Sequence, residues 1–229
     1  MTTPSAKTTV EPQYQIQLDT LAELGPVQLG PTASHLWRSD PRHLGFLLAR
    51  YKFCAKMLAG KSSVLEVGCG DGVGMRVVMQ EVGAIHGVDI DPSFVEWATA
   101  HARHEGLRCT FSTLDITREA PVGPYDAVYS LDLIEHIPKE QEQTYVRNLA
   151  GALKPDGVCI VGTPNVTASA HASRWSVEGH INLQSAESLK KLLLGHFQNV
   201  FLFSMNDEVV HSGFYAMAHY LFALAVGRK

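Results

Sequence analysis

From residue 63 onward, short runs of apolar residues alternate with longer segments whose apolar positions recur at helical spacing. The strand-like runs are 63–68, 84–90, 108–116, 125–134, 158–165, 199–205 and 214–226. The helix-like segments between them are 72–83, 92–106, 139–157 and 185–197. Strands that alternate with helices indicate right-handed βαβ units and a parallel sheet covered on both faces.

The last two strand-like runs have no segment of helical length between them, so we expect them to pair antiparallel at an edge of the sheet. The second of these runs lies in the apolar stretch 213–227. That stretch is shorter than the roughly 20 residues of a membrane-spanning helix and contains His219, so a buried strand is favoured over a membrane contact.

The N-terminal part of the chain has a different pattern. Residues 1–13 are rich in Thr and Pro and predict a disordered arm. Weak helical patterning follows over residues 14–29. A second, better bounded helix is expected over 39–60, because Pro41 stands at its first turn and Gly60 at its end.

Composition narrows the functional classes. The 229 residues, 45% of them hydrophobic, are enough for one sizeable core. A net charge of −4 provides no positive field for nucleic acid or anionic lipid. Cys54, Cys69, Cys109 and Cys159 form no C-x-x-C pair, which favours reduced thiols over a disulfide framework or a zinc site. The first residues lack the apolar region of a signal peptide, so a cytoplasmic location is expected.

The stretch VLEVGCGDGVG, residues 64–74, places four glycines within seven positions at the end of the first expected strand. Glycine suits backbone that turns with positive φ or that another group approaches closely. A tight turn alone would explain the loop, but ligands of open parallel sheets bind at the carboxyl ends of strands, where this loop lies. The G-x-G-x-x-G register fails at every glycine and no Lys-Ser or Lys-Thr follows, which argues against a dinucleotide or P-loop site.

Three acidic residues lie at the ends of three successive expected strands. Glu66 precedes the glycines, and its carboxylate would repel a pyrophosphate but attract an ammonium or sulfonium group. Asp89 ends the second strand, where it can accept both hydroxyls of an unphosphorylated ribose. Asp115 ends the third strand, where it could take the exocyclic amine of adenine. The three together describe an adenosine that carries a cation.

The motifs VLEVGCGDG, GVDID, LDI, DAVYSLDLIEHIP, LKPDG and IVGTPN make residues 58–226 resemble class I S-adenosylmethionine-dependent methyltransferases. SLDLIEHIP followed by GH is similar to the ubiquinone-biosynthesis O-methyltransferases and related small-molecule enzymes. The resemblance implies an α/β fold with a Rossmann-like, seven-stranded, mostly parallel sheet, helices on both faces and an antiparallel terminal hairpin. It also implies an N-terminal helical lid at 14–60 before a methyltransferase domain at 61–229.

The same resemblance implies S-adenosylmethionine as cofactor and S-adenosylhomocysteine as product. The cofactor contacts that it implies, with the cysteine of the glycine loop included, are Glu66, Gly68, Cys69, Gly70, Asp89, Ile90, Asp115, Ile116 and Leu131. The fourth strand lacks the Asn/Asp-Pro-Pro-Tyr turn of enzymes that methylate amino groups of bases or glutamine, which disfavours N-methylation of a base.

His136 and His180 are the candidate catalytic residues. An alcohol must lose a proton as it attacks a methyl group, and histidine suits that work near neutral pH. Two alternatives stay open for His136: a rim residue that hydrogen-bonds its loop, or a member of a divalent-ion site with Asp132 and Glu135. We assign no metal from the sequence.

The sequence therefore predicts a methyltransferase that acts on a hydroxyl of a small molecule, such as a sugar, a glycan precursor or another secondary metabolite. The alternative is a domain that binds S-adenosylmethionine or a partner without turnover. Methylation of protein or tRNA is disfavoured by the acidic balance and by the lack of a basic stripe. The expected partners are a small-molecule acceptor and at most a second copy in a homodimer, without nucleic acid or a membrane span.

Overall fold

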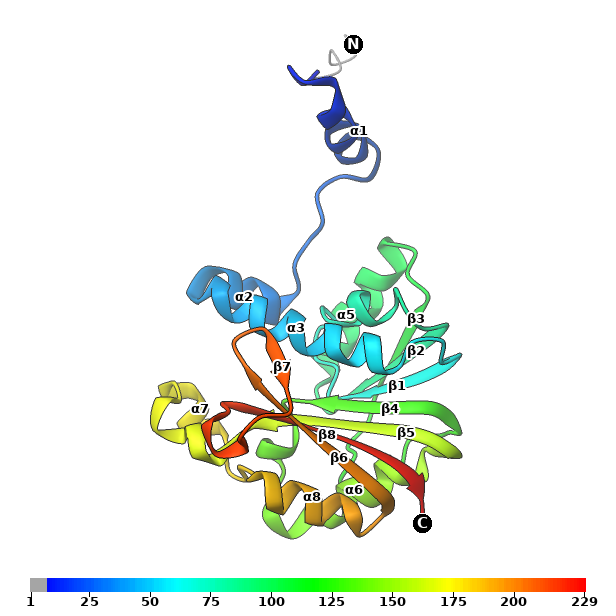
Figure 1. The fold of residues 1–229 in the computed structure, drawn as a ribbon. Coiled ribbons are helices and arrows are strands. Elements are labelled where there is room, and N and C mark those ends of the chain that lie inside the picture. The colour runs from blue at the N-terminus through cyan, green and yellow to red at the C-terminus, as the bar shows by residue number, and fades with distance from the viewer. Residues whose placement is uncertain (1–7) are drawn as a thin grey trace.

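The computed structural model describes residues 8–229, so residues 1–7 of the expected arm lie outside the described residues. Within the described range, eight strands form one sheet (Figure 1). They are β1 (Ser63–Val67), β2 (Ala84–Asp89), β3 (Cys109–Thr113), β4 (Tyr125–Leu131), β5 (Leu153–Pro164), β6 (Phe197–Asn206), β7 (Val209–His211) and β8 (Tyr220–Arg228). Their order along the sheet is β3-β2-β1-β4-β5-β8-β6-β7.

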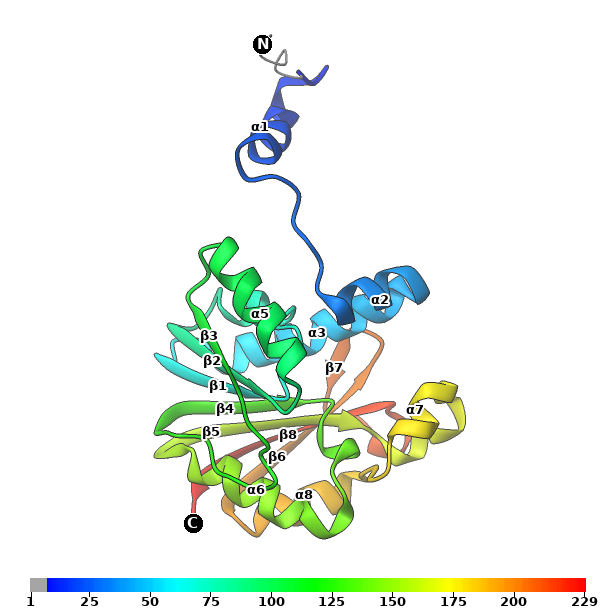
Figure 2. The same cartoon turned by 180° about the vertical axis from the view of Figure 1, so that it is seen from behind.

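Helices cover both faces of this sheet. The α-helices are α1 (Gln15–Leu24), α2 (Pro31–Ser39), α3 (Pro41–Met57), α4 (Met75–Val78), α5 (Pro92–His104), α6 (Glu142–Gly151), α7 (Arg174–Gly179) and α8 (Ala186–Leu194). Short 3₁₀ helices are η1 (Pro12–Tyr14), η2 (Ile134–His136), η3 (Lys139–Gln141), η4 (Val166–His171) and η5 (Tyr215–Met217). Figures 1 and 2 show α3 and α5 on one face and α6 and α8 on the other.

The strand pairing confirms the expected fold class. Strands β1 to β5 pair in parallel, whereas β8 pairs antiparallel with both β5 and β6. The parallel part brings the carboxyl ends of five strands to one edge, where ligands of such sheets bind. The structure adds one strand to the expected seven, because β7 turns back on β6. Asp207 has a φ of 49° in that turn, which the hydrophobic pattern does not reveal.

An apolar cluster lies on each face of the sheet. Successive residues of a strand point to opposite faces. Val64 of β1 therefore belongs to the same cluster as Tyr51 of α3, whereas Leu65 belongs to the cluster on the other face, with Leu149 of α6 and Leu193 of α8. Burying a side chain of this size stabilises the fold by about 1.5–3 kcal/mol. The two clusters together fix the strand ends that carry the candidate site.

The helix expected over 72–83 is much shorter in the structure. Only Met75–Val78 forms an α-helix, and it has 4 residues. The glycine loop takes up the preceding residues, since Gly72 has a φ of 72° and its amide is hydrogen-bonded to the carbonyl of Cys69 at 2.9 Å. Because the glycine loop extends to Gly74, the helix begins only at Met75.

Two strand boundaries also differ from the expectation. Strand β5 begins at Leu153, inside the expected helix 139–157, because Pro155 lacks the amide hydrogen that a helix needs. The last strand begins at Tyr220 rather than at Phe214. The residues before Tyr220 form η5, and Phe214 is 73% exposed, so this part of the apolar stretch is surface rather than core.

The helix expected over 39–60 is α3, and its second half belongs to the core. Phe53 packs against Phe203 of β6 and Phe222 of β8, with ring centroids 5.2 and 4.4 Å apart. Cys54 and Leu58 are fully buried. The helix is therefore fixed to the sheet along its C-terminal half.

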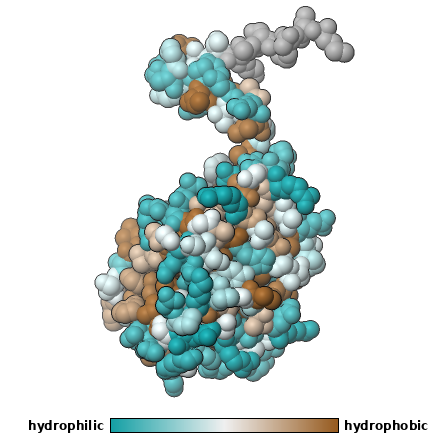
Figure 3. All heavy atoms as spheres, turned by 90° about the vertical axis from the view of Figure 1, so that its right-hand side faces the viewer, coloured by the Kyte–Doolittle hydropathy of each residue, from teal (hydrophilic) through white to brown (hydrophobic). Residues whose placement is uncertain are grey.

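The two helices before α3 differ in how they are held. At the start of α2, the amides of Thr32 and Ala33 donate hydrogen bonds to the carboxylate of Asp71 in the glycine loop, at 2.8 and 3.2 Å. Helix α1 has no buried residue and stands away from the body (Figure 1), with apolar side chains on its surface (Figure 3). The lid function of residues 14–60 stays a prediction. In the part of the chain that the structure describes, no helix is long and apolar enough to span a membrane.

Candidate active site

The glycine loop wraps around the carboxyl end of β1 with a backbone that only glycine adopts easily. Gly68, Gly70 and Gly72 have φ angles of 80°, 51° and 72°. The amide of Gly68 donates a hydrogen bond to the carbonyl of Val88 at 2.8 Å, which ties the loop to β2. A side chain at Gly68 would also approach Leu133 to 3.0 Å. The expected positive-φ turn is confirmed.

A cavity of about 280 Å³ opens beside this loop at the carboxyl ends of β1, β2 and β3. We refer to it as the first cavity. Five of the nine expected cofactor contacts line it, namely Gly68, Asp89, Ile90, Asp115 and Ile116. The structure thus brings together acidic and apolar side chains from three strand ends that are far apart in the sequence.

Asp89 is held with its carboxylate oriented at the rim of the first cavity. Its Oδ2 accepts a hydrogen bond from the amide of Gly70 at 2.8 Å, and its Oδ1 accepts one from the amide of Asp91 at 2.9 Å. A carboxylate has about four lone-pair sites, so both oxygens can still accept ribose hydroxyls. Ile90 is 64% exposed beside it and presents an apolar surface to the same cavity.

Asp115 is held by its own turn. Its Oδ1 accepts from the amide and hydroxyl of Thr117 at 2.9 and 2.6 Å, and Arg118 lies 3.1 Å from its Oδ2. The hydrogen bond from the Thr117 hydroxyl is the main cause that lowers the pKa of Asp115 below its ordinary value. The carboxylate is therefore ionised near neutral pH and ready to accept a further donor such as an amine.

Glu66 does not line the first cavity. It is 1% exposed, and its two carboxylate oxygens accept hydrogen bonds from the hydroxyls of Tyr51 at 2.9 Å and Tyr129 at 2.7 Å. Burial raises the pKa of Glu66 to about 8. The alternation of side chains along β1 points Glu66 toward α3. Its carboxylate is therefore not exposed to the first cavity, where the cofactor is expected.

The other three expected contacts also lie outside the first cavity's lining. Gly70 acts through its amide, which holds Asp89. Cys69 is 4% exposed and Leu131 is 4% exposed, and both pack in the cluster on the α3 face. Cys69 and Leu131 therefore anchor the glycine loop and the end of β4 in the core on the α3 face.

The first cavity has a further wall that sequence reasoning did not identify. Four residues that follow β4 also line the cavity, namely Leu133, Ile137, Pro138 and Gln141. The apolar pattern marks Leu133 and Ile137 as buried positions, but it does not say that they face a cavity. The proximity of Leu133 to Gly68 is visible only in three dimensions.

The structure brings His136 and His180 together. Their ring centroids are 5.0 Å apart. The Nδ1 atom of His136 lies 2.9 Å from the carbonyl oxygen of Gly179, which is 43 residues further along the chain. Since Nδ1 of His136 donates to this carbonyl, Nε2 is the nitrogen that keeps its lone pair. Burial, followed by the neighbouring His136, lowers the pKa of His180.

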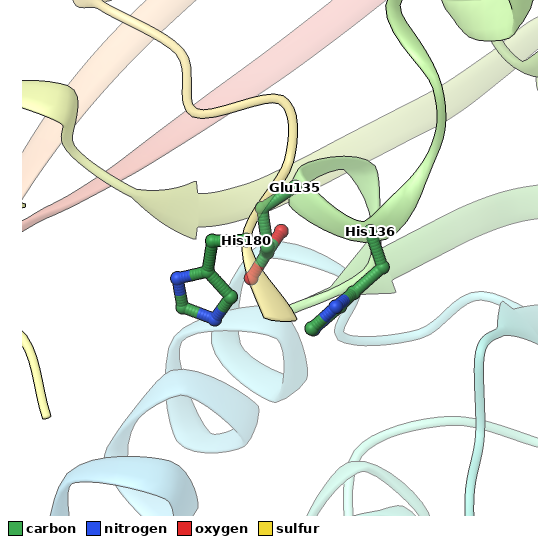
Figure 4. Close-up of side chains that lie close together, drawn as sticks. All are labelled: Glu135, His136 and His180. Carbon is green, nitrogen blue, oxygen red and sulfur yellow. The ribbon is translucent and has the colours of Figure 1, made fainter. Parts of the chain in front are cut away.

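Glu135 completes a cluster with these histidines (Figure 4). One ligand atom each from Glu135, His136 and His180 lies within 4.8 Å of the others. Glu135 is fully buried; its Oε2 accepts from the hydroxyl of Thr163 at 2.9 Å, while its Oε1 has no partner. Burial, and then the charge of Asp132, raises the pKa of Glu135 well above its ordinary value.

Asp132 is not part of this cluster, although the sequence makes it a candidate ion ligand together with Glu135 and His136. Nη1 of Arg50 donates to both of its carboxylate oxygens at 2.7 Å. The guanidinium carbon of Arg50 also lies 4.0 Å from the centre of the Tyr220 ring. Asp132 has a φ of 53°, which starts the turn that leads to η2. Among the potential ligands, His180 takes the place that was expected for Asp132.

A second cavity, of about 520 Å³, lies on the other side of the histidine pair. His180 lines it, together with residues from α3, η4 and α7 and with His219, the residue before β8. His136, in turn, lines the first cavity. The histidine pair therefore stands where the two cavities adjoin.

Residues 64–157 match the model of a methyltransferase domain. A structure of an S-adenosylmethionine-dependent methyltransferase from Clostridium acetobutylicum superposes with a TM-score of 0.67 at 13% identity, over 85% of this chain and 96% of that one. The N-methyltransferase NodS from Bradyrhizobium japonicum, solved with S-adenosylhomocysteine, gives 0.60 at 18% identity, over 92% and 99%. Residues 64–157 thus match a methyltransferase domain, and the chain has the fold seen in structures of S-adenosylmethionine-dependent methyltransferases, as the resemblance implied.

A curated relative is more specific. The ubiquinone biosynthesis O-methyltransferase of Psychrobacter arcticus is 30% identical over 151 residues, which are 64% of this chain and 55% of the relative. The chain spans about half the length of the first curated relatives that it matches.

Proposed function

We propose that this protein uses S-adenosylmethionine to methylate a hydroxyl group of a small molecule. The observation that carries the proposal is the histidine pair between the two cavities. The first cavity presents the acidic strand ends expected for an adenosine, and the second is large enough for an acceptor. A base at their junction lies where an acceptor oxygen would meet a methyl group.

The lining of the first cavity fits the cofactor. Asp89 offers free acceptor sites to ribose hydroxyls, Asp115 offers one to an amine, and Ile90 and Ile116 offer apolar surface to a flat ring. Gly68 and Leu133 both line the cavity, and Leu133 packs so close to Gly68 that there is no room for a side chain at this position. When bound, S-adenosylmethionine supplies a methyl group on a positively charged sulfur.

His136 is the base that we favour. Its Nδ1 is fixed on the carbonyl of Gly179, so its Nε2 can take the proton of an acceptor hydroxyl. The cofactor, held at Asp89 and Asp115, would supply its methyl carbon to the acceptor oxygen and would keep the carbon–sulfur electron pair on its sulfur. Most of the acceleration comes from holding the acceptor in line, and the base adds to it. His180, neutral near pH 7, can orient the acceptor or act as the base itself.

The cluster of Glu135, His136 and His180 also offers a second mechanism. Carboxylate and imidazole are ligands for a divalent cation, and such an ion would polarise the acceptor oxygen. The unpartnered Oε1 of Glu135 is the observation that favours it. Chelation of ions separates this mechanism from a simple histidine base.

Replacing Asp89 by Ala is expected to weaken S-adenosylhomocysteine binding at least tenfold, because each lost hydrogen bond to a charged group is worth about 1.5–3 kcal/mol. Isothermal titration calorimetry measures the affinity, with Asp89→Asn as the milder variant. Asp156→Ala is the matched control, since this aspartate is exposed and far from the first cavity. Wild-type affinity in folded Asp89→Ala protein would refute the assignment of Asp89.

The activity itself is tested by transfer of label from tritiated S-adenosylmethionine to a panel of small hydroxylated compounds. Labelled product, identified by mass spectrometry, supports the enzyme. Cofactor binding without transfer to any acceptor supports the alternative, a domain that binds S-adenosylmethionine without turnover. Label in bulk protein or tRNA instead of small molecules would replace the proposed substrate class.

A further inference from the structure

The second cavity carries a cluster of rings that the proposed chemistry does not use. His43 and Phe46 come from the first turns of α3, and His219 comes from the residue before β8. The ring of Phe46 lies between the two imidazoles, with centroids 6.3 Å from each. We call these three side chains the ring cluster. It shares the second cavity with His180, so an acceptor held by the ring cluster can reach the histidine pair.

Both imidazoles of the ring cluster are neutral near pH 7. Burial, and then the charge of Arg50, lowers the pKa of His43 and of His219. The acidic groups that face them, Asp132 and Asp40 for His43 and Asp207 for His219, act in the opposite direction but have the smaller effect. A neutral imidazole has one N–H donor and one nitrogen acceptor.

These donors and acceptors are free for a ligand. Among the described residues, no hydrogen bond joins the ring nitrogens of His43 or His219 to another protein group, and both half-buried side chains line the second cavity. A hydroxyl group, which also donates once and accepts, is the matching partner for such an imidazole.

The rest of the lining points the same way. Ser169 and His171 of η4 add a hydroxyl and an imidazole to the lining, whereas the side chains of Asn165, Ser173 and Ser176 already form hydrogen bonds within the protein. Among the described lining residues, the guanidinium is that of Arg50, which is already paired with Asp132. Because Asp40 and Asp207 also line the cavity, the described lining offers an anionic ligand no unpaired positive charge.

An apolar tail does not fit this lining either. Among the described residues, the apolar side chains of the cavity are Phe46, Pro164, Ala168, Ala172 and Leu183, and polar groups lie among them. Phe46 gives a flat surface of the size of one ring, flanked by the imidazoles of His43 and His219. Aromatic faces and hydroxyl-matching groups together suit a compact ring with several hydroxyls.

We infer that the methyl acceptor is an uncharged, hydroxyl-rich ring of the carbohydrate or cyclitol type, held by His43, Phe46 and His219. The inference rests on the proposed function, since it concerns the acceptor of the same methyl transfer. Phe46 packs on the apolar face of the acceptor ring, and the two imidazoles bind its hydroxyls. The hydroxyl that is turned toward the histidine pair receives the methyl group.

The test compares two kinds of acceptor with tritiated S-adenosylmethionine as donor. One set holds methyl pyranosides and cyclitols, and the other holds 4-hexylcatechol, a phenol with an apolar tail. The wild-type protein is expected to label members of the first set and not the catechol. His43→Phe and His219→Phe remove the hydrogen bonds but keep a ring, and each is expected to raise KM about tenfold, as the loss of roughly one hydrogen bond predicts.

Three readouts separate binding of the acceptor from a structural role. The affinity for S-adenosylhomocysteine is expected to stay within about twofold in both variants, and kcat is expected to change less than KM. His43→Gln and His219→Gln keep a donor and an acceptor and are expected to lie closer to the wild type. His104→Phe, on the exposed face of α5, is the control and is expected to change neither constant.

Each other outcome overturns the inference in a recognisable way. Transfer to hexylcatechol without transfer to any polyol refutes the hydroxyl-rich acceptor but leaves the methyltransferase proposal standing. Transfer to polyols with an unchanged KM in both Phe variants refutes the ring cluster as their binding site. No binding of S-adenosylhomocysteine by the wild type refutes the proposed function, and the polyol acceptor with it.

Discussion

Replacing His136 by Gln is expected to lower kcat by about 10²–10⁴-fold, the usual contribution of a general base. Gln can keep the hydrogen bond to the carbonyl of Gly179, so the loop is expected to stay in place while the proton acceptor is lost. The affinity for S-adenosylhomocysteine is expected to stay within about twofold. Steady-state kinetics with a labelled acceptor and calorimetry with S-adenosylhomocysteine measure the two quantities.

His180→Gln distinguishes which histidine takes the proton. If His180 only orients the acceptor, its Gln variant loses less in kcat and more in KM than His136→Gln does. If His180 is the base, the rate rises with pH along a limb below the ordinary histidine pKa of about 6.5, because burial lowers the pKa of His180. His104→Gln on α5 serves as the histidine control.

The ion mechanism gives a different pattern. Loss of turnover in a chelator, with recovery on addition of Mg²⁺, would replace the histidine base by an ion held at Glu135, His136 and His180. Under that mechanism, Glu135→Gln would abolish turnover as well. If both histidine variants turn over like wild type and the chelator has no effect, neither histidine belongs to the catalytic set.

The expected acidic residues that line the first cavity are those at strand ends. Asp89 and Asp115 follow the last apolar residues of β2 and β3, and parallel pairing brings those ends to one edge. Glu66 is the penultimate residue of β1. Because it lies within the strand, its side chain must face one side of the sheet or the other. The spacing of acidic residues in the sequence does not distinguish an acid within a strand from an acid at the strand's end. The position of the strand boundary does.

The histidine cluster could be predicted only in part. The sequence favours His136 because it follows β4, but its partners come from α7's end and from β5, which depend on how the long segment after β5 folds back. The backbone carbonyl of Glu135 accepts from the amides of Ile181 and Asn182 at 2.8 and 3.0 Å, and these hydrogen bonds fix that segment. Main-chain contacts of this kind leave no signature in residue type.

Arg50 shows the same limit for charged pairs. The helical pattern of α3 marks this position only as facing the core, where an arginine is unusual. Its partner Asp132 is 82 residues away and has a positive φ that nothing in the sequence indicates. The sequence therefore offered Asp132 as an ion ligand, and the structure commits it to a guanidinium instead.

The wild-type protein is expected to lose stability between pH 5 and pH 8, and Glu66→Gln is expected to reduce that loss. Burial raises the pKa of Glu66 to about 8, against an ordinary value of about 4.5. Above pH 4.5 the unfolded chain releases this proton, whereas the folded chain keeps it until about pH 8. The contribution of Glu66 to the free energy of unfolding is thus complete below pH 4.5 and disappears as the pH rises through 8.

The difference between the two proteins is expected to be on the order of 3 kcal/mol over this range. Gln has no proton to lose and can still accept from one tyrosine hydroxyl and donate to the other, so Tyr51 and Tyr129 keep their partners. Some loss remains in the variant, because burial also raises the pKa of Glu135. Urea unfolding at pH 5 and pH 8 measures the change, with Glu140→Gln on the surface as control. Equal losses in wild type and Glu66→Gln would mean that Glu66 is already ionised in the fold, and that a cation or a rearranged α3 reaches it.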